Sequence, residues 1–490
     1  MRLHTMAAAI GLTLALAGCV SSGGIHPSGS LMEASSLKSE RSLDGITVSP
    51  AAWPQQDWWT ALGDSQLDGL ITEVLHDNPG LAAADARAQQ AQAAAGVADA
   101  QRGPTVNGGA SVAGARLPPA LSPGGNSHFS LAKYGYASFN WGLDLWGGKR
   151  AAWEAALGQA RAAEIDRQAA RIELSTNVAR AYTQLGYAYA QQDVAKAELE
   201  RANRARDLTR QRVSAGIDSQ LQLKQSDSEV ATAEQEHVVA TRAIDAARSS
   251  LSVLLGKGPD RGLDIARPQV LKPAALAVPG NLSMDLIGHR ADLVAARWRV
   301  EAASKDIKVA KTEFMPNVSI GAMAGLLNLG GGNLFTLKNR FYELGPSLSL
   351  PIFDSGRLRA NLAGKDAQYD LAVAQYNQTL VGATNQVADD YNALQSVQQQ
   401  IEAQQRALDA ATEAWQLSEQ RYKAGIGNYL EALIVRQQLL QAQQRMAALQ
   451  SQQVDLSVQL IQALGGGYRP QAEAHEVAAV STSPVSERSL

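Results

Sequence analysis

Two long proline-free stretches constrain the fold of this chain more than any other feature of its sequence. The first runs from Ala151 to Val213, and the second covers residues 358–423. An unbroken helix of about 63 residues would be roughly 95 Å long, because an α-helix rises 1.5 Å per residue. Few globular domains could enclose such a helix. Each long helix therefore needs partner helices of similar length to bury its apolar stripe.

Apolar residues recur along both stretches at steps of three and four, which places them on one face of each helix. The composition agrees with closely packed helices. Hydrophobic residues make up 45% of the chain but aromatic residues only 5%, because alanine supplies much of the apolar count. The first expected stripe is Leu174, Val178, Tyr182, Leu185 and Tyr189, and the second is Val373, Tyr376, Leu380, Val387, Tyr391 and Leu394.

The chain contains two copies of one unit. The segment LTRQRVSAGIDSQLQ at 208–222 aligns without gaps on LSEQRYKAGIGNYLE at 417–431, and two earlier segments match in the same order. We therefore expect two structural repeats, at 53–262 and 281–467, joined by a linker at 263–280. Each repeat reads as a helix, two strands and two long helices around a turn. The long helices are expected at 151–213 and 218–255, and at 358–423 and 428–464.

Four segments have the period-2 pattern of strands with one apolar face. They lie at about 104–115, 134–146, 316–327 and 341–353. In the third, Val318, Ile320 and Ala322 alternate with Ser319 and Gly321. A length of roughly ten residues matches a tilted membrane-spanning strand. The strands of a small soluble sheet are the alternative interpretation, although strands of such a sheet would be less uniform in length.

The strand count predicts an oligomer. After Cys19 no apolar run is long enough for a membrane-spanning helix, so any crossing is expected to use strands. Strands in lipid must close into a barrel, and four strands cannot close. Barrels of about eight strands are filled by their own side chains, whereas three chains would supply twelve strands and a lumen. The long hairpins of three chains would continue this barrel as a tube of helices.

The N-terminal residues have the pattern of a lipoprotein signal peptide. Arg2 precedes an apolar run at 7–17, which is too short to span a bilayer and ends in Leu16-Ala17-Gly18-Cys19. This pattern resembles a lipobox and predicts that Cys19, the single cysteine, is lipidated after removal of residues 1–18. A buried cysteine in an ordinary signal peptide is the alternative. Residues 19–52 are expected to form a flexible lipidated tether, and residues 468–490 a flexible tail.

Several function classes lack support in the sequence. The chain has 44 basic and 47 acidic residues and no basic block, so no nucleic acid partner is expected. Its seven histidines are scattered without metal-ligand spacing, and we assign no metal and no cofactor. No catalytic or phosphate-binding motif is present. We therefore expect a protein that is not an enzyme.

The turns between the long helices carry the same sequence in both copies. Gly216 and Gly425 suit the left-handed residue that ends a helix. Ordinary helix capping is one reading of these turns. Because the turns lie at the far end of the predicted helical tube, they are also candidates for docking a partner. The candidate docking residues are Arg212, Ala215, Gly216 and Ile217 in the first copy and Arg421, Ala424, Gly425 and Ile426 in the second.

From about residue 53 to residue 467 the chain resembles the outer membrane factor family, the TolC-like efflux channels. Within that family it resembles the NodT-like lipoprotein branch of RND-type efflux systems. The residues that carry the resemblance are Trp58-Trp59 with Asp64, Asn78-Pro79, Leu143-Asp144-Leu145-Trp146-Gly147, Leu350-Pro351-Ile352-Phe353-Asp354, and the paired Arg-x-x-Ala-Gly-Ile turns.

The resemblance implies a mixed α and β membrane protein with an internal duplication. Three copies would form a 12-stranded transmembrane β-barrel, four strands per chain, that continues into a long periplasmic α-helical coiled-coil barrel. The expected partners of this homotrimer are outer-membrane lipid, a periplasmic adaptor (membrane fusion) protein and an inner-membrane RND transporter. A type I secretion exit duct and a coiled-coil scaffold lipoprotein without a pore are the alternative functions.

The resemblance also suggests gate residues. Family members close the periplasmic tip with hydrogen bonds and ion pairs and often carry acidic rings beyond it. Tyr422 and Glu431 fall at such positions, whereas Ile434 stands where many relatives have a second acid. Glu431 has a plain alternative as a solvated residue on a helix surface.

Overall fold

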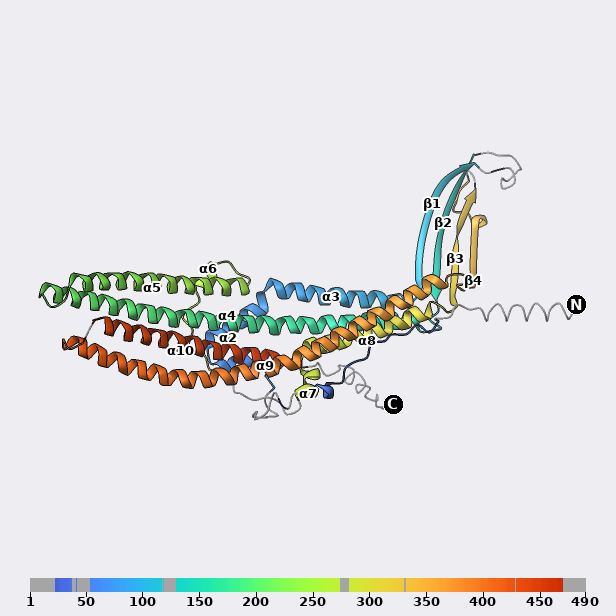
Figure 1. Ribbon diagram of the computed structural model, residues 1–490. Coiled ribbons are helices and arrows are strands. Elements are labelled where there is room, and N and C mark those ends of the chain that lie inside the picture. Colours follow the sequence, from blue (N-terminus) through green and yellow to red (C-terminus); the bar gives the residue numbers. More distant parts are fainter. Residues whose placement is uncertain are drawn as a thin grey trace, which may run out of the picture. The chain divides into compact units, whose positions relative to one another are not determined.

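The computed structural model describes residues 23–37, 41, 53–116, 118, 129–273, 282–329, 332–427 and 429–469. Its elements follow the same order in both copies (Figure 1). The first copy contains η3 (Trp58–Leu62), α2 (Ser65–Asp77), α3 (Pro79–Ala100), β1 (Thr105–Arg116), β2 (Phe129–Gly142), α4 (Gly148–Ser214), α5 (Gln220–Leu254) and α6 (Asp260–Leu263). The second contains α7 (Leu282–His289), α8 (Ala291–Thr312), β3 (Asn317–Leu329), η5 (Leu337–Asn339), β4 (Arg340–Ser349), α9 (Ser355–Lys423) and α10 (Tyr429–Ala463). A short turn, η1 (Ala34–Ser36), precedes them.

The two proline-free stretches are single helices. α4 has 67 residues and α9 has 69. The central residues of the first predicted stripe, Val178, Tyr182 and Leu185, are 0% exposed, and all six residues of the second stripe are buried. Among the described residues, no helix combines the length and the apolar character that a membrane span requires.

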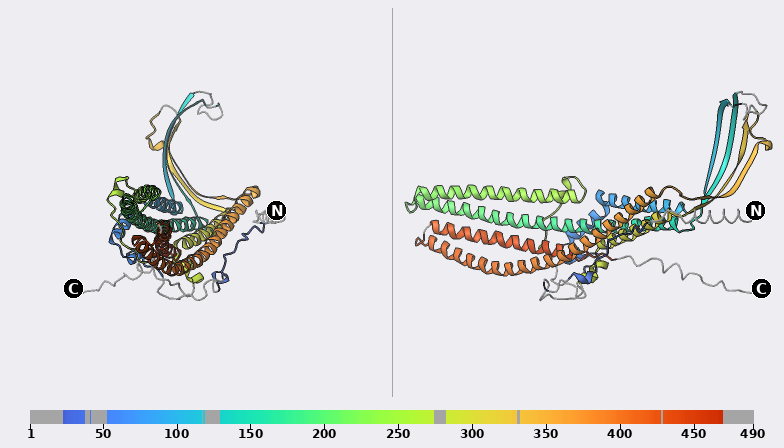
Figure 2. Two further views of the ribbon diagram at one scale, coloured as in Figure 1. Left: turned by 60° about the vertical axis from the view of Figure 1, so that its left-hand side comes forward. Right: turned by 45° about the vertical axis from the view of Figure 1, so that its right-hand side comes forward.

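The chain divides into two compact units. The first contains the four strands with the adjoining parts of α3, α4, α8 and α9. Its strands form one antiparallel sheet in the order β1-β2-β3-β4, and Figure 2 shows them side by side in a curved sheet. The second unit contains α2, α5, α7 and α10 with the remaining parts of α3, α4, α8 and α9.

The strand register places most of the apolar residues of the four strands on one face of the sheet. Ile320 of β3 lies opposite Trp141 of β2 and Pro346 of β4. Because side chains alternate across a strand, these pairs fix the two faces. The apolar face carries Val106, Val112, Ala137, Phe139, Trp141, Val318, Ile320, Ala322, Leu326, Tyr342, Leu344 and Leu348.

Two strands end earlier than the hydrophobic pattern predicts. β2 stops at Gly142 instead of 146, because the side chain of Asp144 accepts hydrogen bonds from the N–H groups of Lys149 and Arg150 at 2.9 and 2.8 Å and so begins α4. β4 stops at Ser349 instead of 353, just before Pro351, which has no N–H to donate to a ladder. The apolar residues Leu145 and Ile352 therefore lie in the connections between strand and helix and not in the strands.

The segment expected to be a flexible tether is partly docked on α9. The Ser28 N–H donates to both carboxylate oxygens of Asp370 at 3.0 and 3.2 Å, and its hydroxyl donates to Oδ2 at 2.7 Å. The Gly29 N–H donates to Oδ1 of Asp370 at 2.7 Å. These hydrogen bonds lower the pKa of Asp370, and the bond from Gly29 has the largest effect. Ile25 packs against a buried cluster that includes Phe314. Composition predicted flexibility over 19–52 but not these contacts.

The core of the second unit lies where α2 packs between the long helices. It contains Leu67, Ile71, Val178, Leu185, Leu251 and Val458. Asp64, the N-cap of α2, accepts a hydrogen bond from the buried Tyr182 hydroxyl at 2.8 Å and from the Gln269 N–H at 2.9 Å. Its other oxygen accepts from the Gln66 N–H at 2.8 Å. Asp64 thus joins the cap of α2 to α4 and to the segment after α6.

Candidate functional site

The turn between α4 and α5 is a tightly bonded helix end. Gly216 has a φ of 74°, in the left-handed region that favours glycine. The Ile217 N–H donates to the Arg212 carbonyl at 2.8 Å, and the Gly216 N–H donates to the Val213 carbonyl at 3.0 Å. Ser219 and Gln222 then form a capping box at the start of α5. The turn is thereby held from both sides.

The turn between α9 and α10 repeats this geometry. Gly425 has a φ of 76°, the Ile426 N–H donates to the Arg421 carbonyl at 3.1 Å, and the Gly425 N–H donates to the Tyr422 carbonyl at 3.1 Å. One position differs in chemistry between the copies. Gly427 stands where the first turn has Asp218, and a Cβ at Gly427 would lie 2.9 Å from the Tyr422 nitrogen. The acidic side chain of the first turn therefore has no counterpart in the second.

Asp218 connects the two turns of one chain. Its carboxylate accepts two hydrogen bonds from the Arg212 guanidinium, at 2.9 and 3.3 Å, and one from the Tyr422 hydroxyl at 3.1 Å. The Arg212 guanidinium also lies 5.0 Å from the centre of the Tyr422 ring. The Asp218 carboxylate raises the pKa of Arg212, and burial raises the pKa of the Tyr422 hydroxyl. At neutral pH, Arg212 therefore stays charged and Tyr422 keeps its hydroxyl proton. We call this set the tip latch.

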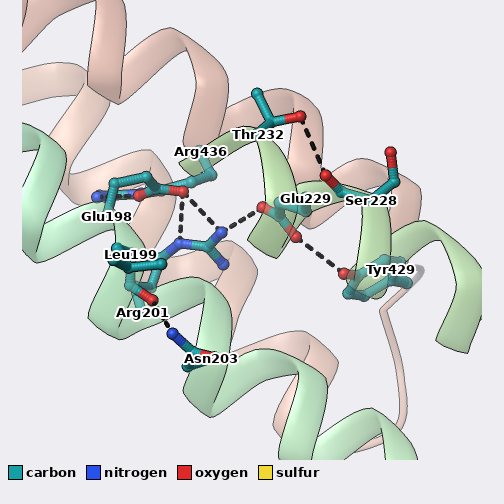
Figure 3. Close-up of polar contacts among 9 residues, drawn as sticks. All are labelled: Glu198, Leu199, Arg201, Asn203, Ser228, Glu229, Thr232, Tyr429 and Arg436. Atoms are coloured by element: carbon teal, nitrogen blue, oxygen red, sulfur yellow. Dashed lines mark hydrogen bonds and ion pairs between the residues drawn. The ribbon is translucent and has the colours of Figure 1, made fainter. Parts of the chain in front are cut away.

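A second polar cluster lies farther from the two turns than the tip latch does. It joins α4, α5 and α10 by hydrogen bonds (Figure 3). Arg436 of α10 donates from Nε to Glu198 of α4 at 2.7 Å, and Arg201 donates from Nε to the other oxygen of Glu198 at 2.9 Å. Arg201 also pairs with Glu229 of α5, which accepts from the Tyr429 hydroxyl at 3.0 Å. We call these five residues the charge cluster.

The charge cluster is buried and electrically balanced. The side chains of Glu198, Arg201 and Arg436 are 6%, 12% and 10% exposed. Two guanidinium groups face two carboxylates, which satisfies the requirement that buried charges be paired. The ring of Trp415 on α9 lies 5.9 and 5.5 Å from the Arg201 and Arg436 guanidinium carbons, so the fourth helix contacts the cluster as well.

A cavity of about 270 Å³ is lined by Tyr422 of the tip latch and by Arg201 and Tyr429 of the charge cluster. Its walls include Leu208, Trp415, Tyr422 and Tyr429, and the rings of the two tyrosines are 5.6 Å apart. The tip latch and the charge cluster therefore meet through the buried side chains of Tyr422 and Tyr429.

The structure divides the sequence-predicted residues into two groups. Arg212 and Tyr422 meet at Asp218, as described above. Ile217 and Ile426 are 64% and 72% exposed on the two turns, next to exposed Ala215, Ala424 and Arg421. Glu431 is exposed in the first turn of α10. Cys19 lies outside the described residues.

Sequence reasoning missed Asp218 and the charge cluster. Asp218 follows Arg212 by six residues across a turn, a local signal that could have suggested their pairing. Glu198 and Arg436 are 238 residues apart, and no local pattern links them. Among the described residues, no group of three or more histidine, cysteine, aspartate or glutamate side chains could hold a metal ion.

The sequence profile of the outer membrane efflux protein family matches residues 70–257 and 282–466. The chain belongs to this family. The two matched ranges confirm the duplication, and with the structural likeness given below they confirm the predicted fold class of a mixed α and β outer-membrane channel protein. The outer membrane efflux proteins are a family of channels and not a class of enzymes.

Named relatives agree with this assignment. The chain is 35% identical to the fusaric acid resistance protein FusA of Burkholderia cepacia, over 74% of this chain and 69% of FusA. It is 31% identical to the multidrug resistance outer membrane protein MdtP of Escherichia coli, over 87% and 89%. The crystal structure of the outer membrane protein VceC of Vibrio cholerae is similar with a TM-score of 0.79 and 34% identity, over 85% of this chain and 100% of VceC. We therefore identify this chain as an efflux channel protein of the outer membrane.

Proposed function

We propose that this efflux protein is the exit duct of a tripartite RND-type pump. Three copies would close a 12-stranded barrel in the outer membrane, and their helical hairpins would form the periplasmic part of the duct. A periplasmic adaptor protein and an inner-membrane RND transporter would complete the pump. The duct would pass drugs or other small toxic solutes without a chemical step.

The four-stranded sheet is the observation that carries this proposal. Its order leaves β1 and β4 as edges, and its apolar face is open, with Val106, Tyr342 and Leu344 72%, 84% and 76% exposed. Unpaired edge groups in lipid cost several kcal/mol each, so β1 needs β4 of a neighbouring copy. Two copies would give about eight strands filled by side chains, whereas three copies leave a lumen.

The turns support a closed periplasmic end that a partner can engage. The tip latch ties the two hairpins of one chain together, and breaking it would cost a charge-assisted hydrogen bond network. The exposed Ile217 and Ile426 offer apolar contacts to an adaptor protein. Export of toxic solutes is supported by the names of FusA, a fusaric acid resistance protein, and MdtP, a multidrug resistance protein.

A lipid on Cys19 would add a second anchor to the strands. The docked residues Ser28 and Gly29 begin nine residues after Cys19, so the tether between lipid and protein would be short. We expect Cys19→Ser to remove incorporation of radiolabelled palmitate. The matched control is Ser22→Ala, which keeps the cysteine and should label as wild type does. Equal labelling of Cys19→Ser and wild type would overturn the anchor.

The proposed duct is tested by the native mass and single-channel conductance of the purified protein in detergent and then in planar bilayers. We expect a trimer with small, discrete conductance steps. A water-soluble species without conductance would refute the duct and favour a coiled-coil scaffold lipoprotein. Co-purification with an ABC-type secretion transporter in place of an RND transporter would favour the type I secretion duct.

A further inference from the structure

Three aromatic rings form a row on the polar face of the sheet. The ring centres of Tyr134 and Tyr136 on β2 are 4.8 Å apart, with 27° between the ring planes. The ring of Phe341 on β4 stacks on Tyr134 at 6.1 Å and 15°. The strand register places all three side chains on the face opposite Ile320 and Trp141. The row therefore runs from the middle of β2 across β3 to the beginning of β4.

Glycines make room for these rings. A Cβ at Gly109 of β1 would lie 2.6 Å from Cε1 of Tyr136, and one at Gly325 of β3 would lie 2.8 Å from Cε1 of Phe341. The two rings thus occupy the space that neighbouring side chains would otherwise fill, and they lie against the backbone. Each ring is only half-buried, so part of the aromatic surface stays open.

The polar face also carries a negative charge beside the row. Glu343 follows Phe341 by two residues on β4 and shares its face. Among the described side chains of this face, Glu343 carries the single formal charge, and it makes no ion pair with a described residue. Serine and asparagine side chains supply most of the remaining polar groups there.

We propose that the row of Tyr134, Tyr136 and Phe341, with Glu343, is a transit site for planar aromatic cations inside the channel. The inference rests on the proposed function, because closure of the barrel with its apolar face to lipid turns the polar face to the lumen. A planar ring can stack on the exposed tyrosine and phenylalanine surface. Its positive charge is attracted by the ring faces and by Glu343, of which a trimer holds three.

The experiment is a single-channel recording. Ethidium is added on the side of the bilayer at which β2 begins, at Phe129. We expect ethidium to cause discrete current blockades in the wild-type channel. In the double variant Tyr134→Leu/Phe341→Leu, these blockades should be at least about fivefold shorter, because each lost aromatic contact shortens the time that ethidium stays bound by roughly two- to tenfold. Tyr342→Leu is the matched control, because this neighbouring aromatic residue lies on the opposite face and is 84% exposed. It should leave the blockades unchanged.

Two further probes separate stacking from charge. Tetraethylammonium, a cation without rings, should block at least about fivefold more briefly than ethidium. Glu343→Gln should lower the frequency of ethidium blockades and weaken their salt dependence. Ethidium blockades of equal duration in wild type and the double variant, or no blockade of a conducting wild-type channel, would overturn the transit site alone. Absence of any wild-type conductance would overturn the proposed duct and the transit site with it.

Discussion

At the scale of single residues, Asp390 of α9 is a half-buried carboxyl group whose Oδ2 atom has no hydrogen-bond partner among the described residues. Burial, and then the nearby Asp389, raise its pKa from 3.8 to about 6, against the opposing charges of Arg180 and Arg290. Asp455 adds to the rise. The folded protein therefore binds this proton more tightly than the unfolded chain, and stability falls as pH rises between these values.

We expect Asp390→Asn to be more stable than wild type at pH 8, by about 1 kcal/mol after allowance for solvent screening. The difference should shrink as pH falls below about 6 and vanish only below 3.8, where the carboxyl group is protonated in both the folded and the unfolded protein. Thermal unfolding at several pH values measures it. Asp409→Asn, an exposed residue on the same helix, is the control and should show no such trend. A constant difference at all pH values would contradict the assigned cause.

Single residues also show where sequence reasoning reaches its limit. Gly216 and Gly425 could be predicted as turn glycines, because the end of a helix demands a left-handed residue and glycine adopts it without strain. The bond from Tyr422 to Asp218 spans 204 residues and depends on how two hairpins pack. Asp218 also lacks a copy in the second repeat, so the duplication gave no guide to it.

At the scale of elements, the tip latch joins two helical hairpins. Asp218→Asn removes a carboxylate that binds both Arg212 and Tyr422, whereas Tyr422→Phe removes one hydrogen bond. Bonds to a charged group contribute about 1.5–3 kcal/mol. We expect larger single-channel conductance in both variants, with the greater increase in Asp218→Asn. Asp227→Asn, a partly exposed acid of α5 that pairs with Lys224 of the same helix, should conduct as wild type does. Unchanged conductance in Asp218→Asn would exclude the latch from the closed state.

The charge cluster makes a different prediction for the same hairpins. Arg436→Ala leaves two carboxylates of the cluster, Glu198 and Glu229, facing the guanidinium of Arg201 alone, and an uncompensated buried charge costs about 3–5 kcal/mol. We expect faster amide hydrogen exchange in α10 and in the facing turns of α4. Arg445→Ala, an exposed arginine on α10, is the control. Arg436→Met restores volume without charge and should exchange about as fast as Arg436→Ala, since the cluster still holds two carboxylates and one guanidinium. Wild-type exchange in Arg436→Ala would contradict a stabilising role.

The elements themselves were largely predictable because their periodic patterns are long. Val178, Tyr182 and Leu185 share one helix face whatever their partners are, and the alternation around Ile320 requires a strand. The strand ends were less predictable. Apolar Leu145 and Ile352 continue the alternating pattern, but the Asp144 cap and Pro351 end the strands first. Docking of Ser28 on Asp370 was not predictable from a segment rich in serine and glycine.

At the scale of the whole molecule, each chain is incomplete by itself. The edges β1 and β4 would pair with neighbouring copies in the proposed barrel, and the apolar surface around Tyr342 and Leu344 would face lipid. In a trimer, every side chain near the axis occurs three times, so one acidic residue becomes a ring of three. Like charges around a narrow axis disfavour full ionisation and attract cations. The ionic selectivity of the duct is therefore a property of the assembly and not of one chain.

Glu431 is the residue through which this assembly property can be tested. It is exposed in the first turn of α10, and Ile434 offers no second acid one turn later. We expect Glu431→Ala to lower the cation preference of the channel, measured as the reversal potential in a tenfold KCl gradient across a planar bilayer. Glu402→Ala removes the same charge from α9 about 30 Å from the turn and should leave the reversal potential unchanged. An unchanged reversal potential in Glu431→Ala would remove this residue from the gate and leave it a solvated acid on a helix surface.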